Sequence, residues 1–582
     1  MKKNIYRSHY CGKITDTLVS NEIFVSGWIS NIRDHGGIVF VDLRDETGTV
    51  QLVSNEDSMF NGLTRETVIK VVGTVRKRNE EDYNDHIATG TIEVLVSSLE
   101  VLSKAPNELP FEVMTSTNVN EEVRLKYRYL DLRNEKVHNN IIFRAEVIKF
   151  LRDKMYDLGF KEIQTPILTA SSPEGARDYV VPSRKHHGKF YALPQAPQIF
   201  KQLLMVSGFD RYFQIAPCFR DEDARSDRAP GEFYQLDFEM AFAEAEDVYE
   251  VAEEVLYDTF TKFSTKEVSP KPFRKIPFKE AMLKYGTDKP DLRNPLEIID
   301  LTEEFKDTTF KPFQKSIVRG IKVDGIASKS NSWFNELVDY ASSIGMPGIG
   351  YITVEEGNTF KGPIDKFLTD EERMSLINKA QLEVGSVLFF IADRKELKAA
   401  SFAGQIRNEL GRKLDLINPN KFEFCFIVDF PMYEYDEELE QYIFTHNPFS
   451  MPQGGMESLL NKKPEDILAH QYDIVVNGVE LSSGAVRNHD INIMTKAFEI
   501  AGYKEEELKT RFKSLYSAFH FGAPPHAGMA PGVDRMIMLL CDEPNIREVI
   551  AFPMNSNAQD VMMGSPSEIT EQQLRDVHIK IR

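Results

Sequence analysis

The sequence feature that most constrains the fold is a period-two alternation of side chains on both sides of the charged segment 221–228. Such alternation indicates two antiparallel strands with one buried face and one polar face. Before the charged segment, Phe213, Ile215, Pro217 and Phe219 alternate with a set that ends at Arg220. After it, Tyr234, Leu236, Phe238, Met240 and Phe242 alternate with Phe233, Gln235, Asp237 and Glu239. Acids inside a strand are costly to bury unless they bind something, so the polar face predicts a binding site.

A second hairpin is predicted around Asn477-Gly478, a strong type I′ turn signal. A two-residue turn here pairs Val475 with Glu480 and Asp473 with Ser482. Asp473 and Glu480 then share a face as diagonal neighbours. Two carboxylates so placed repel each other unless a cation bridges them, and Mg²⁺ is the usual bridge where phosphates are handled.

Near the C-terminus, the string Ala530-Pro531-Gly532-Val533-Asp534-Arg535 precedes an apolar run, residues 536–540. A glycine turn therefore places an arginine in the first turn of a buried helix. There the guanidinium and the free amides of the helix start could meet one phosphate.

Residues 1 to about 105 contain five short strand patterns with turn residues between them, at 23–29, 38–43, 49–53, 68–75 and 91–99. This spacing predicts a small β-barrel of the OB-fold type. Arg33 and Phe40 bring basic and aromatic groups to one face, which suits stacking on unpaired bases. The alternative interpretation places Phe40 in the barrel core.

Composition excludes several classes of protein. A formal charge of -20 argues against a nonspecific polyanion binder, so any nucleic acid must be held by local patches such as residues 65–78. The alternative interpretation of that patch is a solvated strand edge. The four cysteines lie far apart, and no apolar run reaches about 18 residues. We therefore expect a soluble cytoplasmic protein of several domains that has no contact with a membrane.

Further along the chain, the pattern predicts a helix over 137–158 that ends at Gly159. The extended segment 160–168 contains Pro166, which cannot donate to a ladder, so we expect it at a sheet edge where a partner subunit could pack. A compositional break at 288–295 introduces a segment of mixed helices and strands to about residue 420, interpreted as an inserted α/β domain.

Pro166 after the long helix, Arg220 before the acidic loop, and Gly532-Val533-Asp534-Arg535 resemble motifs 1, 2 and 3 of class II aminoacyl-tRNA synthetases. Residues 173–179, 195–203 and 477–480 resemble the bacterial-type aspartyl-tRNA synthetases. The resemblance implies an α+β multidomain chain with an N-terminal OB-fold β-barrel, a class II antiparallel-sheet catalytic core and an inserted α/β domain. The implied boundaries are 1–105 for the anticodon-binding barrel, 106–135 for a hinge, 136–287 and 421–560 for the core, 288–420 for the insertion and 561–582 for a C-terminal extension.

The family's activity implies that the chain uses ATP and Mg²⁺ to convert L-aspartate to aspartyl-adenylate, then transfers aspartate to the 3′ end of tRNA, as a homodimer. The catalytic residues would be Arg220 and Arg535. The aspartate site would contain Glu174, Gln198, Lys201, Arg220, Asp237, His446 and Arg487. The ATP site would contain Arg220, Asp221, Glu222, Phe233, Glu480, Gly532, Val533, Asp534 and Arg535. Asp473 and Glu480 would bind the metal, and Arg33, Phe40 and Gln51 the anticodon.

The choice of tRNA depends on the barrel, because the aspartate and asparagine anticodons differ at one base. His35, in Asp34-His35-Gly36-Gly37, resembles relaxed members of the family that aspartylate both tRNAs, whereas strict members carry leucine there. Glu81 stands where relaxed members have glycine and strict ones lysine, so it favours neither. We expect activity on tRNA(Asp) and tRNA(Asn), with a tRNA(Asp)-only enzyme as the alternative.

Two further alternatives are less favoured. An inactive RNA-binding relative would be expected to lose Arg220, Arg535 or Glu480, and all three are present. An asparaginyl or lysyl enzyme fits less well, because Lys201 and Arg487 match an anionic side chain and leave a neutral amide poorly matched.

Overall fold

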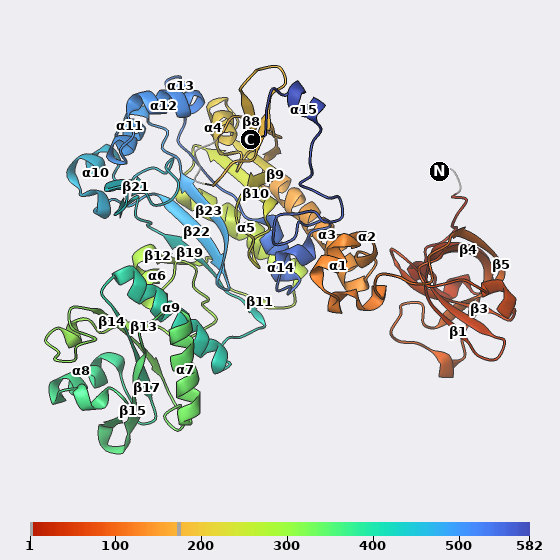
Figure 1. The fold of residues 1–582 in the computed structure, drawn as a ribbon, viewed down its shortest axis with the longest axis horizontal. Helices are drawn as coiled ribbons and strands as arrows, with labels where there is room; N and C mark the ends of the chain where they lie inside the picture. The colour runs from red at the N-terminus through yellow and green to blue at the C-terminus, as the bar shows by residue number, and fades with distance from the viewer. Residues whose placement is uncertain (1–3, 172–175, 582) are drawn as a thin grey trace. The chain divides into compact units, whose positions relative to one another are not determined.

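The computed structural model describes residues 4–171 and 176–581, which form two compact units, 1–116 and 117–582 (Figure 1). No helix within the described ranges is both long and apolar enough to cross a membrane.

The first unit is a closed five-stranded barrel with the order β1-β2-β3-β5-β4, which confirms the predicted OB-type barrel. Its strands are β1 (Glu22–Asp34), β2 (Val39–Asp45), β3 (Gly48–Ser54), β4 (Val68–Lys77) and β5 (Ile92–Ser103). Along β2, Val39, Val41 and Leu43 are buried in the barrel core, whereas Phe40 is only half-buried and points outward. The alternative that Phe40 belongs to the core is therefore wrong.

The second unit is built on an eight-stranded sheet with the order β12-β19-β22-β23-β24-β10-β9-β6. The pairs β12–β19 and β6–β9 at the two ends are parallel, and the pairs between them are antiparallel. The strands are β6 (Lys161–Glu162), β9 (Arg211–Arg220), β10 (Gly231–Ala241), β12 (Arg274–Pro277), β19 (Phe424–Val428), β22 (Gln471–Val476), β23 (Val479–Val486) and β24 (His526–Met529).

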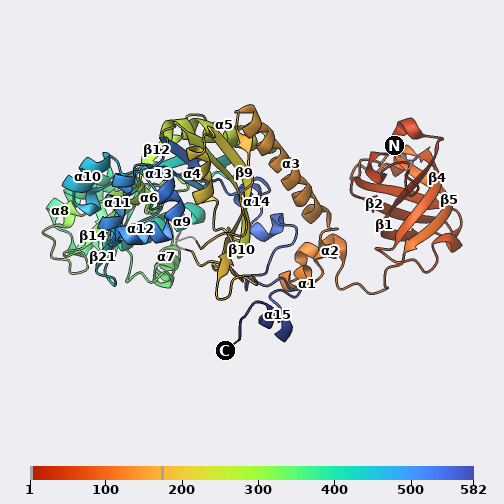
Figure 2. The same cartoon turned by 90° about the horizontal axis from the view of Figure 1, so that it is seen from above.

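Three helices cover the apolar face of this sheet: α3 (Glu135–Asp157), α5 (Ala245–Phe263) and α14 (Val533–Leu540) (Figure 2). Leu236, Phe238 and Met240 of β10 lie in this core, as the alternation predicts. Phe242 does not follow the prediction: it lies beyond the end of β10 with φ 54° and is 76% exposed. The strand ends one residue earlier, so the alternation no longer applies there.

The edge strand β6 is shorter than the extended segment predicted at 160–168, although it does lie at the end of the sheet. Pro166 falls outside it. Because proline cannot donate to the ladder, the pairing with β9 ends before Pro166 is reached.

An insertion between the halves of the core carries its own five-stranded sheet, with the order β13-β14-β17-β15-β16. Helices α7 (Asn331–Ser343) and α9 (Glu396–Lys413) cover one face, and α8 (Asp370–Ala380) covers the other. All of its strand pairs are antiparallel, so the insertion is α+β and the predicted α/β description is wrong. Helices and strands alternate along the chain, but each strand enters the sheet in the reverse direction to its neighbour. The strands are β13 (Ile298–Asp300), β14 (Ile317–Val323), β15 (Gly350–Glu355), β16 (Thr359–Lys361) and β17 (Val387–Asp393).

The remaining elements connect and flank these sheets. The helices are α1 (Glu121–Lys126), α2 (Arg128–Asp131), α4 (Gln198–Val206), α6 (Phe278–Tyr285), α10 (Gly455–Asn461), α11 (Ile491–Ile500), α12 (Glu505–Arg511), α13 (Lys513–Phe519) and α15 (Glu571–Asp576). The short strands are β7 (Val180–Pro182), β8 (Phe190–Ala192), β11 (Glu267–Val268), β18 (Lys421–Phe422), β20 (Tyr433–Asp436) and β21 (Gln441–Phe444).

Candidate active site

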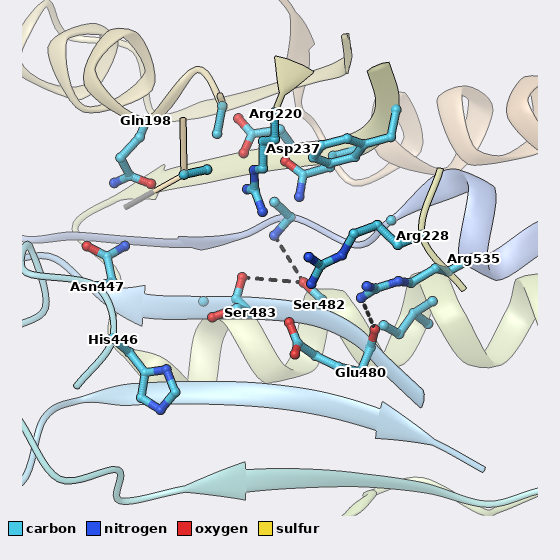
Figure 3. A pocket seen from close by; sticks show the side chains of 18 of the residues that line it. Gln198, Arg220, Arg228, Asp237, His446, Asn447, Glu480, Ser482, Ser483 and Arg535 are labelled. Carbon is cyan, nitrogen blue, oxygen red and sulfur yellow. Dashed lines mark hydrogen bonds between the residues drawn. The ribbon is translucent and has the colours of Figure 1, made fainter. Parts of the chain in front are cut away.

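A cavity of about 580 Å³ lies over the polar face of the large sheet. Its walls come from α4, β9, β10, β23, the segment 444–448 and the start of α14. In Figure 3, the guanidinium groups of Arg220, Arg228 and Arg535 lie on one side of the cavity, with the Glu480 carboxylate and Ser482 below them. The cavity is therefore lined by groups suited to anionic ligands on one side and by a possible cation ligand on the other.

Four buried charged residues form a network at the floor of this cavity. The Lys201 Nζ lies 2.6 Å from Asp237 Oδ1 and 3.4 Å from Glu239 Oε2. Arg487 donates from Nε and Nη2 to the two oxygens of Glu239, at 2.8 and 3.0 Å. All four residues are at most 2% exposed. The two cations and the two carboxylates balance, so the network by itself carries no net buried charge.

The pKa values of the two carboxylates shift in opposite directions. It raises the pKa of Asp237, because a charged group loses water, although Lys201 opposes the shift. Burial would also raise the pKa of Glu239, but Arg487 and Lys201 together lower it overall. Asp237 Oδ2 is buried and makes no hydrogen bond to the described residues. An acceptor in this state is expected to meet a donor from a ligand.

His526 lies behind the network. Its Nε2 lies 3.2 Å from Gln202 Oε1, and its Nδ1 lies 2.8 Å from the Pro524 carbonyl oxygen. Burial lowers the pKa of His526 to about 4, although the charge of Glu239 opposes this shift. The imidazole is therefore neutral at neutral pH, donates through only one of these two nitrogens and adds no charge to the floor.

The second region of the cavity holds the arginines. The Arg220 guanidinium lies over the Phe233 ring, 5.0 Å from its centroid, and Arg220 Nε is buried with no hydrogen bond among the described residues. Arg535 donates from Nη1 to the Glu480 carbonyl oxygen at 2.7 Å and from Nε to the Asp227 carbonyl oxygen at 3.0 Å. Arg535 thus joins motif 3 to the hairpin and to the motif 2 loop.

Motif 3 contributes to the site in two ways. Gly532 and Arg535 line the cavity, whereas the Val533 side chain is fully buried in the hydrophobic core. Asp534 also borders the cavity, but both of its oxygens bond within the protein. Oδ2 accepts from the Tyr234 amide at 2.8 Å and Oδ1 from Arg144 Nη1 at 2.5 Å. Asp534 therefore holds β10 and α3 together behind the cavity wall.

The β22–β23 hairpin carries the candidate metal site. Asn477 and Gly478 have φ of 52° and 82°, as the predicted turn requires, and Val475 pairs with Glu480. Asp473 pairs with Ser483 and not with the predicted Ser482. A bulge adds Leu481 to β23, and this shifts the register by one residue.

Asp473 and Glu480 nevertheless stay close enough to interact. Burial raises the pKa of Asp473 well above its usual value, and the charge of Glu480 raises it further. Asp473 Oδ1 is buried without a hydrogen bond to any described residue. Within 4–171 and 176–581, no group of three or more His, Cys, Asp and Glu side chains could hold a metal. A pair of carboxylates still fits Mg²⁺, which keeps several waters and takes further oxygens from phosphates.

Most of the predicted site residues line one cavity: Gln198, Lys201, Arg220, Glu222, Phe233, Asp237, His446, Glu480, Arg487, Gly532, Asp534 and Arg535. Glu174 lies outside the described residues. Asp221 is exposed, and its amide pairs with the Arg177 carbonyl oxygen beside the loop. Glu239, Arg228 and Lys289 were not among the predicted site residues. The alternation along β10 does place Glu239 on the polar face that predicts a binding site, whereas no local pattern indicates Lys289.

On the barrel, the predicted anticodon residues occur in paired groups. The His35 and Phe40 rings meet edge to face with centroids 5.6 Å apart, and Arg33 pairs with Asp42 at 2.9 Å. Gln51 donates to Glu93 at 3.0 Å. Glu81 is exposed in a separate short helical turn.

Three cations of the patch at 65–78 also lie beside acids. Arg65 pairs with Glu112 and Arg76 with Glu93, both at 2.6 Å, and Lys70 lies 3.9 Å from Glu100. Three cations of the patch are therefore paired with acids, whereas Arg78 donates to the carbonyl oxygens of Ile92 and Asp82.

The fold and the cavity are those of a class II synthetase, and comparison with known families agrees. Residues 120–556 match the family model of class II tRNA synthetases (D, K and N), and residues 23–102 match that of the OB-fold nucleic acid binding domain. The chain belongs to the class II tRNA synthetases of the D, K and N group.

Individual relatives of the chain within this class bear the names of aspartate-tRNA ligases. The chain is 53% identical over 589 residues to an aspartate-tRNA(Asp/Asn) ligase of Ehrlichia canis (strain Jake), covering 99% of each chain. It is 53% identical over 581 residues to an aspartate-tRNA ligase of Streptomyces coelicolor, again covering 99% of each. A solved structure of a putative aspartyl-tRNA synthetase from Leishmania major Friedlin has a TM-score of 0.60 at 19% identity and covers 95% of each chain, which supports the fold.

Proposed function

We propose that this protein is an aspartate-tRNA ligase that activates L-aspartate with ATP and transfers it to tRNA. The observation that carries the proposal is the buried network of Lys201, Asp237, Glu239 and Arg487 at the floor of the cavity. Full-length relatives at 53% identity bear the names of aspartate-tRNA ligases.

The network suits aspartate because the substrate is itself both cationic and anionic. Its ammonium group would meet Asp237, whose Oδ2 has no partner among the described residues. Its side-chain carboxylate would meet Lys201 and Arg487, the latter through Nη1, which takes no part in the bonds to Glu239. Asparagine would place a neutral amide against the same cations and lose a charge-assisted bond. Gln198, His446 and Glu174 would complete this part of the site.

Activation requires little acid–base chemistry. The aspartate α-carboxylate attacks the α-phosphorus in line, and pyrophosphate leaves. Arg220 would stabilise the charge that develops on the α-phosphate, Phe233 and Arg535 would bind the adenine, and Glu222 would contact the nucleotide. Holding both substrates in one cavity supplies much of the rate through positioning.

Asp473 and Glu480 would hold Mg²⁺, and when bound the ion neutralises charge on the phosphate oxygens. The orphaned Oδ1 of Asp473 supports this assignment. Asp473 Oδ1 and the Glu480 carboxylate would supply two of the oxygens around the ion, with phosphate oxygens and water as the others.

We propose that both tRNA(Asp) and tRNA(Asn) are substrates. His35 lies against Phe40 beside the predicted anticodon residues, and several similar relatives bear the name aspartate-tRNA(Asp/Asn) ligase. The Streptomyces coelicolor relative at the same identity bears the name aspartate-tRNA ligase. Charging of purified tRNA(Asn) with aspartate tests this: an efficiency within about tenfold of that for tRNA(Asp) is expected, and His35→Leu should widen the gap. A difference of several orders of magnitude would leave a tRNA(Asp)-only enzyme.

We also propose a homodimer that works in the cytoplasm, where the tRNA substrates are. The edge strand β6 and the exposed apolar side chains of Ile142, Ile167 and Leu168 nearby in the chain support a subunit interface there. Cys11, Cys425 and Cys541 form no disulfide bond, which suits a reducing compartment. Sedimentation at micromolar concentration should give twice the chain mass; a stable monomer would contradict the dimer.

Pyrophosphate exchange into ATP across amino acids tests the main proposal. Aspartate alone is expected to support exchange, and only with Mg²⁺ present. Equal exchange with asparagine or lysine would overturn the assignment of the substrate.

A further inference from the structure

The segment that joins α6 to the insertion places a lysine at the candidate metal site. Lys289 Nζ lies 3.3 Å from Glu480 Oε2 and 2.6 Å from Asp288 Oδ2. Its side chain is 37% exposed, so water reaches the ammonium while the carboxylates hold it. Asp473, the second carboxylate of the site, also acts electrostatically on Lys289.

This position is fixed by the backbone of the joining segment. Thr287 Oγ1 accepts from the Lys289 amide at 3.1 Å, which shapes the turn. Beyond the lysine, Asp291 packs against the hairpin turn, where a Cβ added at Gly478 would lie 3.4 Å from Asp291 Cβ. The segment that carries Lys289 therefore rests directly on the β22–β23 hairpin.

The insertion anchors the same segment from the other side. The buried Arg407 of α9 donates from Nη2 to the carbonyl oxygens of Asp291 and Asn294, at 3.0 and 2.7 Å, and from Nε to that of Leu296 at 2.6 Å. One side chain of the insertion thus satisfies three carbonyl groups of the segment. Lys289 is held at Glu480 by contacts from both the core and the insertion.

An ammonium and a divalent cation compete for the same carboxylate oxygen. While Lys289 pairs with Glu480, its positive charge offsets the repulsion between Glu480 and Asp473. A bound metal ion would offset the same repulsion. It also occupies Glu480 Oε2, one of the oxygens a metal would use. Binding of the metal therefore requires the lysine to move off this oxygen.

Resting on the metal site of the proposed function, we propose that Lys289 is a positioning residue that holds Glu480 when no divalent cation is bound and weakens binding of such a cation to the nucleotide-free enzyme.

The test uses Mn²⁺ as the probe, with the free ion measured from its electron paramagnetic resonance signal. Without ATP, Lys289→Met should bind Mn²⁺ about three- to tenfold more tightly than the unmodified enzyme, since it removes a partly exposed competing charge. Lys289→Arg should retain the weaker binding. The matched control is Lys284→Met, which breaks the pair with Glu280 at 3.1 Å and should leave Mn²⁺ affinity unchanged. Unchanged or weaker Mn²⁺ binding by Lys289→Met would overturn the proposal.

A second arm separates this inference from the metal site itself. Asp473→Asn should abolish the additional Mn²⁺ binding that ATP induces. If it does, and Lys289→Met leaves the nucleotide-free affinity unchanged, only the role of Lys289 fails. If Asp473→Asn has no effect on Mn²⁺ binding in either state, both the metal assignment and the role of Lys289 fail.

Discussion

The barrel and the cavity floor both pair an arginine with a carboxylate from another part of the same sheet, but the two pairs differ in burial. On the barrel, Arg33 and Asp42 have side chains 44% and 22% exposed. At the cavity floor, Arg487 and Glu239 are 2% and 0% exposed. The chemistry of the pair is the same, so the difference in burial decides what each pair can do.

An exposed pair contributes little to stability and opens at small cost, which suits a surface that must accept the charges of a nucleic acid. A buried pair cannot open without stranding a charge in a poorly hydrated site. The cavity floor therefore stays assembled, and only a substrate with matching charges can join it. Flexible pairing suits a large polyanion, and fixed pairing suits selection of one small molecule.

The largest expected effect is the difference in stability loss when the carboxylate of each pair is neutralised in turn. Glu239→Gln leaves Arg487 and Lys201 short of one negative charge, so it should destabilise the core by about 3 to 5 kcal/mol. Asp42→Asn should cost less than about 1 kcal/mol in the barrel. Hydrogen exchange of the β10 and β2 segments measures each unit separately. Similar costs at both sites would show that burial does not set the strength of these two pairs.

The next effect concerns choice of amino acid. Arg487→Ala should lower discrimination between aspartate and asparagine by about 2 to 4 kcal/mol, because it removes a buried charge-assisted contact. The measurement is kcat/KM for pyrophosphate exchange with each amino acid. Arg33→Ala serves as the control and should leave the ratio unchanged. Unaltered discrimination in Arg487→Ala would assign the substrate carboxylate to other groups.

A smaller effect should appear with pH, through His526. The unfolded chain takes up a proton near pH 6.5, whereas the folded protein does so only near its depressed pKa of about 4. The stability that this residue contributes is therefore fully present above pH 6.5 and decreases as the pH is lowered towards 4. Between pH 7 and 5 the loss should be about 2 kcal/mol.

His526→Gln should remove that loss, so the difference in unfolding free energy between the variant and the unmodified protein should change with pH by this amount. His86→Gln, an exposed histidine of the barrel, is the control. A difference that does not vary with pH would contradict the neutral imidazole.

The smallest effect is expected at the barrel. Arg33→Ala should weaken tRNA binding by about 1 kcal/mol or less and reduce the slope of log affinity against log salt by about 0.7, the value for one contact to single-stranded phosphate. Filter binding over a salt series measures it, with Arg487→Ala as the control of unchanged slope. A steeper slope in Arg33→Ala would contradict a phosphate contact.

Much of this architecture was predictable because the signals are local. The alternation along β9 and β10 follows from the two-residue repeat of a strand, and the turn at Asn477-Gly478 follows from residues that accept positive φ. The five barrel strands are separated by turn residues in the same way. Each of these features is determined within a few residues of chain.

The features that could not be predicted depend on contacts distant in sequence. The bulge at Leu481 places this residue in the core, and a repeat of two cannot indicate which strand carries an extra residue. The antiparallel direction of the insertion's strands depends on the path of the connections between them, which no local pattern indicates. The contact of Lys289 with Glu480 spans nearly two hundred residues and has no periodic signal.

Arg407 has a consequence for any attempt to shorten this protein. Deleting the insertion from β13 (Ile298) onward would remove the donor for the carbonyl groups of Asp291, Asn294 and Leu296, each of which would then need another partner. The stub left behind would include the residues that lie against the hairpin turn. The insertion is therefore not a detachable module, and a truncated enzyme would need a redesigned junction before loss of activity could be attributed to the missing domain.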